Sequence, residues 1–301
     1  MKSKTIRFLS FLFPCLFACS IGHAYEQDNW YLANEWSLPG SSGVAYYEDN
    51  ATGIGQIYAT STSSEDIKVY DLNGSLARTI AIASDRFDPR DICIDIYGTI
   101  FIAEQYCVTC LGNDGTFRWR TGKNSSISNR GTSGSANGQF SNASGILLHK
   151  DSNLYIADRE NNRIQVLDKN GSFIRIIGGY GTAPGFFKSP ADISQLKNGN
   201  FIVSDEDYLH LFDSNGSFLK RTEEIDPYFV SSSDEGLIFA YKRGGGTFRS
   251  SIFTNELDYI GTTGMYPVHK RPRSCFTPSG DLITSIDSKL SIWKRAFRTK
   301  G

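Results

Sequence analysis

Two sets of acidic residues recur at fixed places along this chain and could bind a metal ion or a substrate. Asp91 and Asp192 form the first set, and each stands one residue before an isoleucine in a short apolar run. The second set has one acid at the end of each of three other apolar runs: Glu104, Asp158 and Asp205. Calcium requires several hard oxygen ligands, and a bound metal ion can polarise a substrate carbonyl. We therefore treat both sets as candidate metal or substrate sites.

A structural role is the alternative for every one of these acids. The family resemblance given below implies an ion pair across a hairpin loop between Asp158 and Arg163, five residues further along the chain. We expect that pair to be exposed or half-exposed, so that it contributes at most about 1 kcal/mol to stability. Cys107 and Tyr208 stand where the other two segments would place this arginine, which leaves the acids of those segments without the equivalent partner. A solvated turn would account for acids of that kind.

The cysteines that follow residue 24 are candidates for disulfide bonds: Cys93, Cys107, Cys110 and Cys275. Inert buried thiols are the alternative. Cys107 and Cys110 form a CxxC motif, which in redox proteins opens a helix and in zinc sites is joined by further ligands. Here the motif lies in a strand pattern and no second CxxC exists. The sequence therefore favours a structural role for these cysteines over redox or zinc chemistry.

One pattern repeats six times and provides the elements that would position these residues. Residues 154–173 match residues 201–218 position by position after one short gap, and the same frame is clear at 57–75 and 101–117. Fainter copies follow at 237–254 and 282–293. Each copy predicts four short strands, with Asn-Gly or Asp-Gly supplying the positive φ of a tight hairpin turn. Both strand faces are apolar, as expected for sheets packed between other sheets. The chain is therefore predicted to be all-β, a six-bladed β-propeller of four-stranded blades.

The best copy also resembles a known family. The run from Ile156 to Asp168, preceded by Gly138-Gln139-Phe140 and followed by Gly178-Gly179-Tyr180-Gly181, is similar to an NHL repeat. Six NHL-type units imply a six-bladed β-propeller. Propellers of this family serve as binding platforms and as enzymes, so the fold does not decide the function.

Two groups of related enzymes suggest chemistry for the central channel. The peptidyl-amidating lyases place three histidines around a catalytic zinc ion. This chain has three histidines after residue 24, but they occupy different registers of their repeats, which favours packing or surface roles: His149, His210 and His269. The gluconolactonase-like hydrolases hold calcium with carboxylate and Asn side chains, and the acidic sets described above are the candidates for such a site.

The first 24 residues are predicted to be a signal peptide, and residues 25–301 a single propeller domain with a Ser/Gly-rich loop inserted at about 123–137. Lysine and arginine precede an apolar stretch that is too short to span a bilayer comfortably, and Gly22-His23-Ala24 is a small-x-small cleavage pattern. Lipidation at Cys19 is the less favoured alternative. We expect an exported protein, periplasmic or extracellular, with no transmembrane span. Residues 30–36 are expected to close the ring by pairing with the last blade.

Composition limits the partners. The chain of 301 residues carries 31 Lys and Arg against 32 Asp and Glu, and removing residues 1–24 would leave 28 basic residues against 32 acidic ones. Nucleic acid is excluded as an expected partner, because phosphate binding requires clustered positive charge. The predicted function is a binding or scaffold module for a protein, peptide or glycan on one loop face. The alternative is a calcium-type, metal-assisted hydrolase or lyase with its site in the channel.

Overall fold

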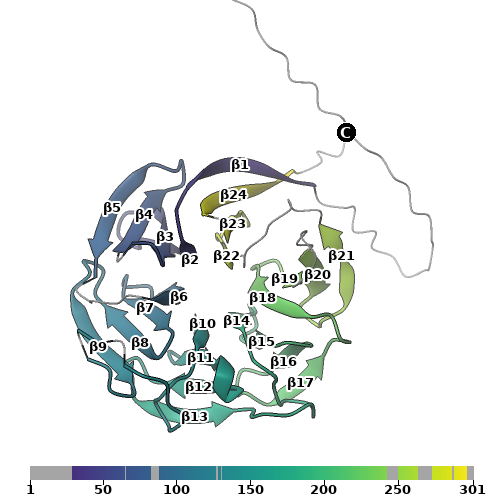
Figure 1. The fold of residues 1–301 in the computed structure, drawn as a ribbon. Helices are drawn as coiled ribbons and strands as arrows, with labels where there is room; N and C mark the ends of the chain where they lie inside the picture. The colour runs from purple at the N-terminus through teal and green to yellow at the C-terminus, as the bar shows by residue number, and fades with distance from the viewer. Residues whose placement is uncertain are drawn as a thin grey trace, which may run out of the picture.

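The chain folds into six four-stranded antiparallel sheets arranged in a ring (Figure 1). A computed structural model describes residues 29–64, 66–82, 88–126, 128–129, 131–242, 250–263, 273–286 and 288–296. The predicted six-bladed β-propeller is confirmed. The predicted signal peptide, Cys19 and His269 lie outside the described residues.

The blades follow one another along the chain, and each begins with the strand nearest the channel (Figure 1). Blade 1 contains β2 (Ser41–Glu48), β3 (Gly55–Ser61), β4 (Asp66–Asp71) and β5 (Leu76–Ala81). Blade 2 contains β6 (Pro89–Ile94), β7 (Ile100–Glu104), β8 (Cys107–Leu111) and β9 (Phe117–Gly122). Blade 3 contains β10 (Ala143–Leu148), β11 (Leu154–Asp158), β12 (Arg163–Leu167) and β13 (Phe173–Ile177), with the short 3-10 helix η1 (Arg159–Asn161) between β11 and β12.

The other three blades have the same order of strands. Blade 4 contains β14 (Asp192–Gln195), β15 (Phe201–Ser204), β16 (Leu209–Phe212) and β17 (Phe218–Arg221). Blade 5 contains β18 (Pro227–Ser232), β19 (Leu237–Lys242), β20 (Ser250–Thr254) and β21 (Tyr259–Thr263). Blade 6 contains β22 (Arg273–Phe276), β23 (Leu282–Ile286) and β24 (Lys289–Ala296), and its outer strand is β1 (Asn29–Ser37) from the other end of the described chain.

The ring is closed by this pairing of the first and last strands. Trp36 of β1 lies opposite Leu290 of β24, and the ladder continues to Asn29 opposite Ala296. The predicted closure by residues 30–36 is therefore confirmed. Because both ends of the ring share one sheet, blade 6 has four strands like the others and opening the ring requires breaking this ladder.

The repeated hairpin turn lies where the sequence places it. Asn73, Asp114, Asn170 and Asn215 each precede a glycine in the turn between the third and fourth strands, and these glycines have φ between +84° and +88°. In the turn of blade 3, the Asp168 carboxylate accepts hydrogen bonds from the backbone N–H groups of Asn170 and Ser172, both at 2.8 Å. A glycine at the positive φ in all four turns, and an acid at the start of those in blades 1, 3 and 4, thus explain the repeated sequence pattern.

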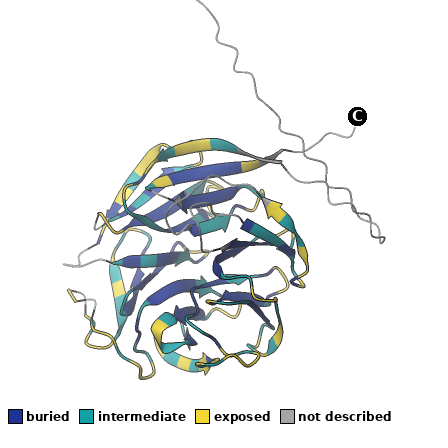
Figure 2. Cartoon of the chain, turned by 45° about the vertical axis from the view of Figure 1, so that its right-hand side comes forward, coloured by how far each residue is buried: buried dark blue, intermediate teal, exposed yellow. Residues whose placement is uncertain are grey.

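The core lies between the blades. The second and third strands of blades 2 and 3 are buried along their whole length, whereas exposed residues gather on outer strands and loops (Figure 2).

The ring has two faces. We call the face on which the inner strands begin the pocket face, and the face that carries the turns after the inner strands the turn face. The described residues include no helix long and apolar enough to cross a membrane.

Candidate functional site

Each of the six inner strands has one residue at the same depth along the channel, and we call this depth a level of the channel. Five of them pair with equivalent residues of the second strands, and Gly43 joins the same level by packing against the backbone of Asp91. In chain order they are Gly43, Asp91, Gly145, Asp192, Phe229 and Arg273. The repeat therefore fixes the backbone at this level, while the side chains differ in size and charge.

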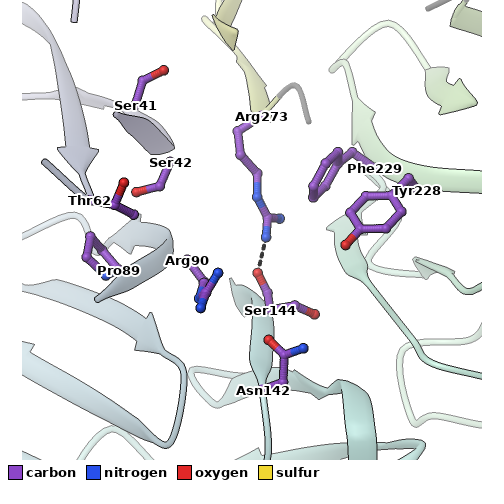
Figure 3. Close-up of a pocket in the computed structure, with 10 residues that line it drawn as sticks. All are labelled: Ser41, Ser42, Thr62, Pro89, Arg90, Asn142, Ser144, Tyr228, Phe229 and Arg273. Atoms are coloured by element: carbon purple, nitrogen blue, oxygen red, sulfur yellow. Dashed lines mark hydrogen bonds between the residues drawn. The ribbon is translucent and has the colours of Figure 1, made fainter. Parts of the chain in front are cut away.

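Three of these side chains form a buried group that we call the channel cluster: Asp91, Asp192 and Arg273. The Arg273 Nη1 atom lies 2.7 Å from Asp192 Oδ1 and 3.4 Å from Asp91 Oδ2. Its Nη2 donates to the carbonyl of Ser144 (Figure 3), and its guanidinium carbon lies 4.3 Å from the centroid of the Phe229 ring. The three charged side chains are at most 12% exposed. The cluster therefore connects blades 2, 4 and 6 across the channel.

Both carboxylates also bind the free edges of inner strands. An inner strand has a neighbour on one side only, so some of its N–H groups lack a ladder partner. Asp91 Oδ2 accepts a hydrogen bond from Ile146 N at 3.0 Å, and Asp192 Oδ2 accepts one from Val230 N at 3.1 Å. Each acid thus accepts a hydrogen bond from the inner strand of the following blade, Asp91 from blade 3 and Asp192 from blade 5.

Small residues make room for this arrangement. A Cβ atom on Gly43 would lie 2.9 Å from the Cα of Asp91, and one on Gly145 would lie 2.9 Å from the Cα of Asp192. Both contacts are with backbone, which cannot rotate away as a flexible side chain could. Glycine at these two positions therefore allows the acid-bearing strands to approach closely.

Burial dominates the electrostatics of the cluster. Removal from water raises the pKa of Asp91, against the opposing effect of Arg273. Burial likewise raises the pKa of Asp192 to about 7, because Arg273 only partly opposes it and the nearby charge of Asp91 adds to it. Two buried acids thus share one guanidinium, and burial favours the neutral form of each.

This donor set does not fit a calcium ion. Three of the four carboxylate oxygens of Asp91 and Asp192 already accept from Arg273 or from backbone N–H groups. Calcium needs six to eight oxygen ligands, and here the guanidinium of Arg273 lies between the two acids in place of a cation. Within the described residues no group of three or more His, Cys, Asp or Glu could hold a metal ion. The structure does bring Asp91 and Asp192 together, but both contact Arg273, a residue that the sequence did not point to.

The second acidic set is not brought together. Glu104, Asp158 and Asp205 end the second strands of three consecutive blades, and each is bound within its own blade. The Asp158 carboxylate accepts from Arg163 Nε at 2.8 Å, as the hairpin spacing indicates, and from Gln165 Nε2 at 3.0 Å. Its side chain is fully buried and that of Arg163 is 10% exposed, so the expectation of an exposed or half-exposed pair was wrong. Burial raises the pKa of Asp158, and the surrounding donors oppose that rise.

The expectation that Glu104 and Asp205 lack a basic partner was also wrong. Arg120, on the fourth strand of blade 2, lies 3.0 Å from Glu104 through its Nη2. His210, on the third strand of blade 4, lies 3.2 Å from Asp205 through its Nε2. Burial would raise the pKa of Asp205, but His210 and the backbone N–H groups of Lys188 and Tyr208 outweigh it and hold the pKa below its usual value. Glu104 and Asp205 thus each have a basic partner on another strand of their own blade.

The four cysteines within the described residues are free thiols. Cys107 and Cys110 lie three residues apart on β8, so their side chains point to opposite faces of the strand. Cys93 and Cys110 both pair with Phe101, from either side, which places them two strand spacings apart, about 10 Å. A disulfide needs Cα atoms within about 7 Å, so neither of these pairs is bridged. Burial raises the pKa of Cys110 and of Cys275 to about 12, which keeps both thiols protonated.

The described histidines lie in separate packing environments. The Nε2 of His149 lies 2.7 Å from the carbonyl oxygen of Gly199, and its ring packs against Tyr155. His210 is packed among aromatic rings and contacts Asp205. The two residues thus hold different parts of blades 3 and 4 in place.

A pocket of about 430 Å³ opens at the channel mouth on the pocket face (Figure 3). Its lining comes from the first residues of the inner strands and their neighbours: Ser41, Ser42, Thr62, Pro89, Arg90, Asn142, Ser144, Tyr228, Phe229 and Arg273. We call it the mouth pocket. Arg273 and Phe229 separate it from the two acids of the channel cluster. Hydroxyl, amide and guanidinium groups therefore face a space large enough for a small polar ligand.

Comparisons with known proteins agree with the architecture. Residues 137–284 match the model of a family described as 6-bladed beta-propeller. A stretch of 95 residues, 30% of this chain, is 28% identical to Protein brain tumor of Drosophila melanogaster. The match spans 9% of the length of that relative.

Solved structures share the fold at low sequence identity. A streptogramin B lyase superposes with a TM-score of 0.64 at 14% identity, over 89% of this chain and 98% of the lyase. A gluconolactonase from Xanthomonas campestris gives 0.62 at 12% identity, over 86% and 87% of the two chains. A chain of a nidogen/laminin complex gives 0.58 at 18% identity, over 75% and 80%. Enzymes and a protein complex are therefore both among its structural neighbours.

Proposed function

We propose that this chain is an exported binding module with NHL-type blades, whose protein, peptide or glycan ligand docks on the pocket face. The observation that carries the proposal is the mouth pocket. Its polar lining lies at the centre of the face that also carries the loops between blades, and loops on a rigid scaffold commonly form binding surfaces.

Exposed aromatic residues on the same face support a macromolecular ligand. The connection from β13 to β14 carries Tyr180, 76% exposed, and Phe186, 46% exposed. Aromatic side chains are enriched at the centres of protein interfaces, where they bury large areas at small entropic cost. A ligand that fills the pocket and reaches this connection would contact both polar and aromatic groups.

The state of the channel carboxylates favours binding over catalysis. A metal-assisted hydrolase or lyase would need acids that are free to hold an ion, whereas Asp91 and Asp192 are held by Arg273 and by backbone N–H groups. The likeness to a lyase and a gluconolactonase supports the alternative only at the level of fold, since one fold hosts many functions. The nidogen/laminin structure shows the same fold within a protein complex.

The proposal is tested with arrays of peptides and glycans, followed by titration of the ligands that bind. Thr62 is exposed on the pocket lining, so Thr62→Trp should fill the pocket without disturbing the core and weaken binding about tenfold or more. Thr52 is an exposed threonine in the β2–β3 turn on the opposite face, and Thr52→Trp should leave binding unchanged. Ligands that bind Thr62→Trp as tightly as the wild type would contradict the proposed site.

Export is tested separately, because it rests on residues 1–24 alone. Expression of the full chain in a bacterial host should release a mature protein that begins at Tyr25, as read by N-terminal sequencing. A mature chain that begins at a lipid-modified Cys19 would support the membrane-anchored alternative. An unprocessed cytoplasmic chain would contradict export.

A further inference from the structure

Arg90 has unused hydrogen-bonding capacity at the wall of the mouth pocket. It lies on β6 next to Asp91, and its side chain points into the pocket (Figure 3). Among the described residues its Nη2 pairs with Asp88 Oδ2 at 3.1 Å, while its Nε–H is buried and has no acceptor. A guanidinium carries five N–H donors, and a buried donor left without an acceptor is unfavourable. The site therefore suits an acceptor that the ligand brings.

The two guanidinium groups of the pocket differ in this respect. Arg273 is committed to Asp91, Asp192 and the carbonyl of Ser144. None of the ten residues that line the pocket is a carboxylate, so no lining residue competes as an acid for Arg90. The hydroxyl groups of Ser42 and Thr62 and the amide of Asn142 complete a polar surface around it. The pocket is therefore arranged to donate hydrogen bonds from Arg90 to a bound group.

The charge balance selects the kind of anion. Asp88 lies beside Arg90, and Asp91 and Asp192 lie behind Arg273, so three acids accompany the two arginines. A dianionic phosphate would be repelled by these acids more strongly than a monoanion. A carboxylate carries one charge and matches the planar fork of a guanidinium.

The rings of the pocket favour a peptide over a sugar acid. Tyr228 and Phe229 are 6% and 3% exposed, and their faces are covered by Arg159 and Arg273, so neither offers an open ring for a sugar to stack on. We propose that the mouth pocket binds the acidic side chain of a peptide or protein ligand, with Arg90 donating to its carboxylate. This inference rests on the proposed binding function and names the ligand group that this function recognises.

The test follows the Arg90 Nε–H signal by NMR while small probes are added to the mature protein. The probe is N-acetyl-glutamate N-methylamide, and its neutral match is N-acetyl-glutamine N-methylamide. We expect the glutamate probe to shift the Arg90 signal in a saturable way and the glutamine probe to bind about tenfold or more weakly, because a charged hydrogen bond is lost. Arg90→Gln should remove this preference, whereas Arg118→Gln, at an exposed position of the outer strand β9, should keep it.

The outcomes separate this inference from the proposed function. Equal binding of both probes, or an Arg90 signal that neither probe moves, overturns the carboxylate assignment and leaves water as the acceptor. Tighter binding of methyl glucuronide than of the glutamate probe overturns the assignment to a peptide. If array ligands are still lost in Thr62→Trp, the binding function stands without the carboxylate. The melting temperature of Arg90→Gln should equal that of the wild type, so that lost binding is not lost folding.

Discussion

At the channel, Asp91 and Asp192 share the guanidinium of Arg273, which comes from a third blade, whereas Asp158 binds the Arg163 of its own hairpin. Both regions bury carboxylates almost completely. They differ in stoichiometry, with two acids to one base in the channel and one acid to one base in the blade. They also differ in reach, because the channel contact joins residues 81 positions apart while the hairpin contact spans five.

This difference separates two kinds of stabilisation in a repeat fold. A hairpin pair fixes the loop of one blade and can be exchanged for another pair, as His210 and Arg120 show in the neighbouring blades. The channel cluster fixes blades relative to one another and has an excess of one acid. We therefore expect changes in the channel to affect the whole ring, and changes in a hairpin to have smaller effects.

The largest effect is expected for Arg273→Leu. Removing the guanidinium leaves two buried carboxylates without their basic partner, which typically costs about 3–5 kcal/mol. Urea unfolding measures this loss. Arg118→Leu, at an exposed position of β9, is the control and should change stability by less than about 0.5 kcal/mol. A loss below about 1 kcal/mol for Arg273→Leu would show that the channel cluster is not a major source of stability.

The pH dependence of the channel should be opposite to that of a blade acid. The folded-state pKa of Asp192 is raised to about 7, so its contribution is fully present below its unfolded pKa, near 4, and is lost as the pH rises through about 7. The unfolding free energy of Asp192→Asn, relative to that of the wild type, should therefore be higher at pH 8 than at pH 5, by an amount on the order of a few kcal/mol. Unfolding free energies at the two pH values test this sign.

The blade acid Asp205 provides the contrast. Its folded-state pKa is lowered, so its contribution is present above its unfolded pKa and is lost as the pH falls through the folded value. Asp205→Asn should therefore lower the unfolding free energy more at pH 6 than at pH 3.5. If both substitutions shift stability in the same direction with pH, the distinction between the two regions fails.

A smaller effect is expected from the pair of Asp158 and Arg163. Because both side chains are buried and hydrogen-bonded, their coupling in a double-mutant cycle should be about 1–3 kcal/mol, above that of an exposed pair. The cycle uses Asp158→Asn and Arg163→Gln, with unfolding measured in urea. A coupling of zero would mean that the two groups act independently in solution.

The fold and one hairpin pair could be predicted from the sequence, because both belong to the repeat. The match between residues 154–173 and 201–218 reveals the blade, and the resemblance of residues 156–168 to an NHL repeat predicts the pair of Asp158 and Arg163. Arg273 could not be found in this way. It lies in a blade whose copy of the repeat is faint, at a level where the other blades carry Gly, Asp or Phe and no second arginine, and its partners are brought close only by closure of the ring.

The basic partners of Glu104 and Asp205 could not be predicted from the sequence for a related reason. Neither base stands at the position equivalent to Arg163: Arg120 is on the fourth strand of blade 2, and His210 lies two residues further along blade 4 than that position. A signal was present for one of them, because His210 occupies the place of Gln165, which itself binds Asp158. Side chains that face one another across a sheet must be compared by register as well as by sequence position.

The central claim is that Arg273 takes the place of a metal ion between Asp91 and Asp192, and calcium titration tests it most directly. A ligand that binds the folded state raises the melting temperature by mass action. We predict that millimolar calcium leaves the melting temperature of the protein unchanged, and that Asp192→Asn melts at the same temperature with and without calcium. A calcium-dependent rise in the wild type that Asp192→Asn abolishes would contradict the claim and restore the metal site.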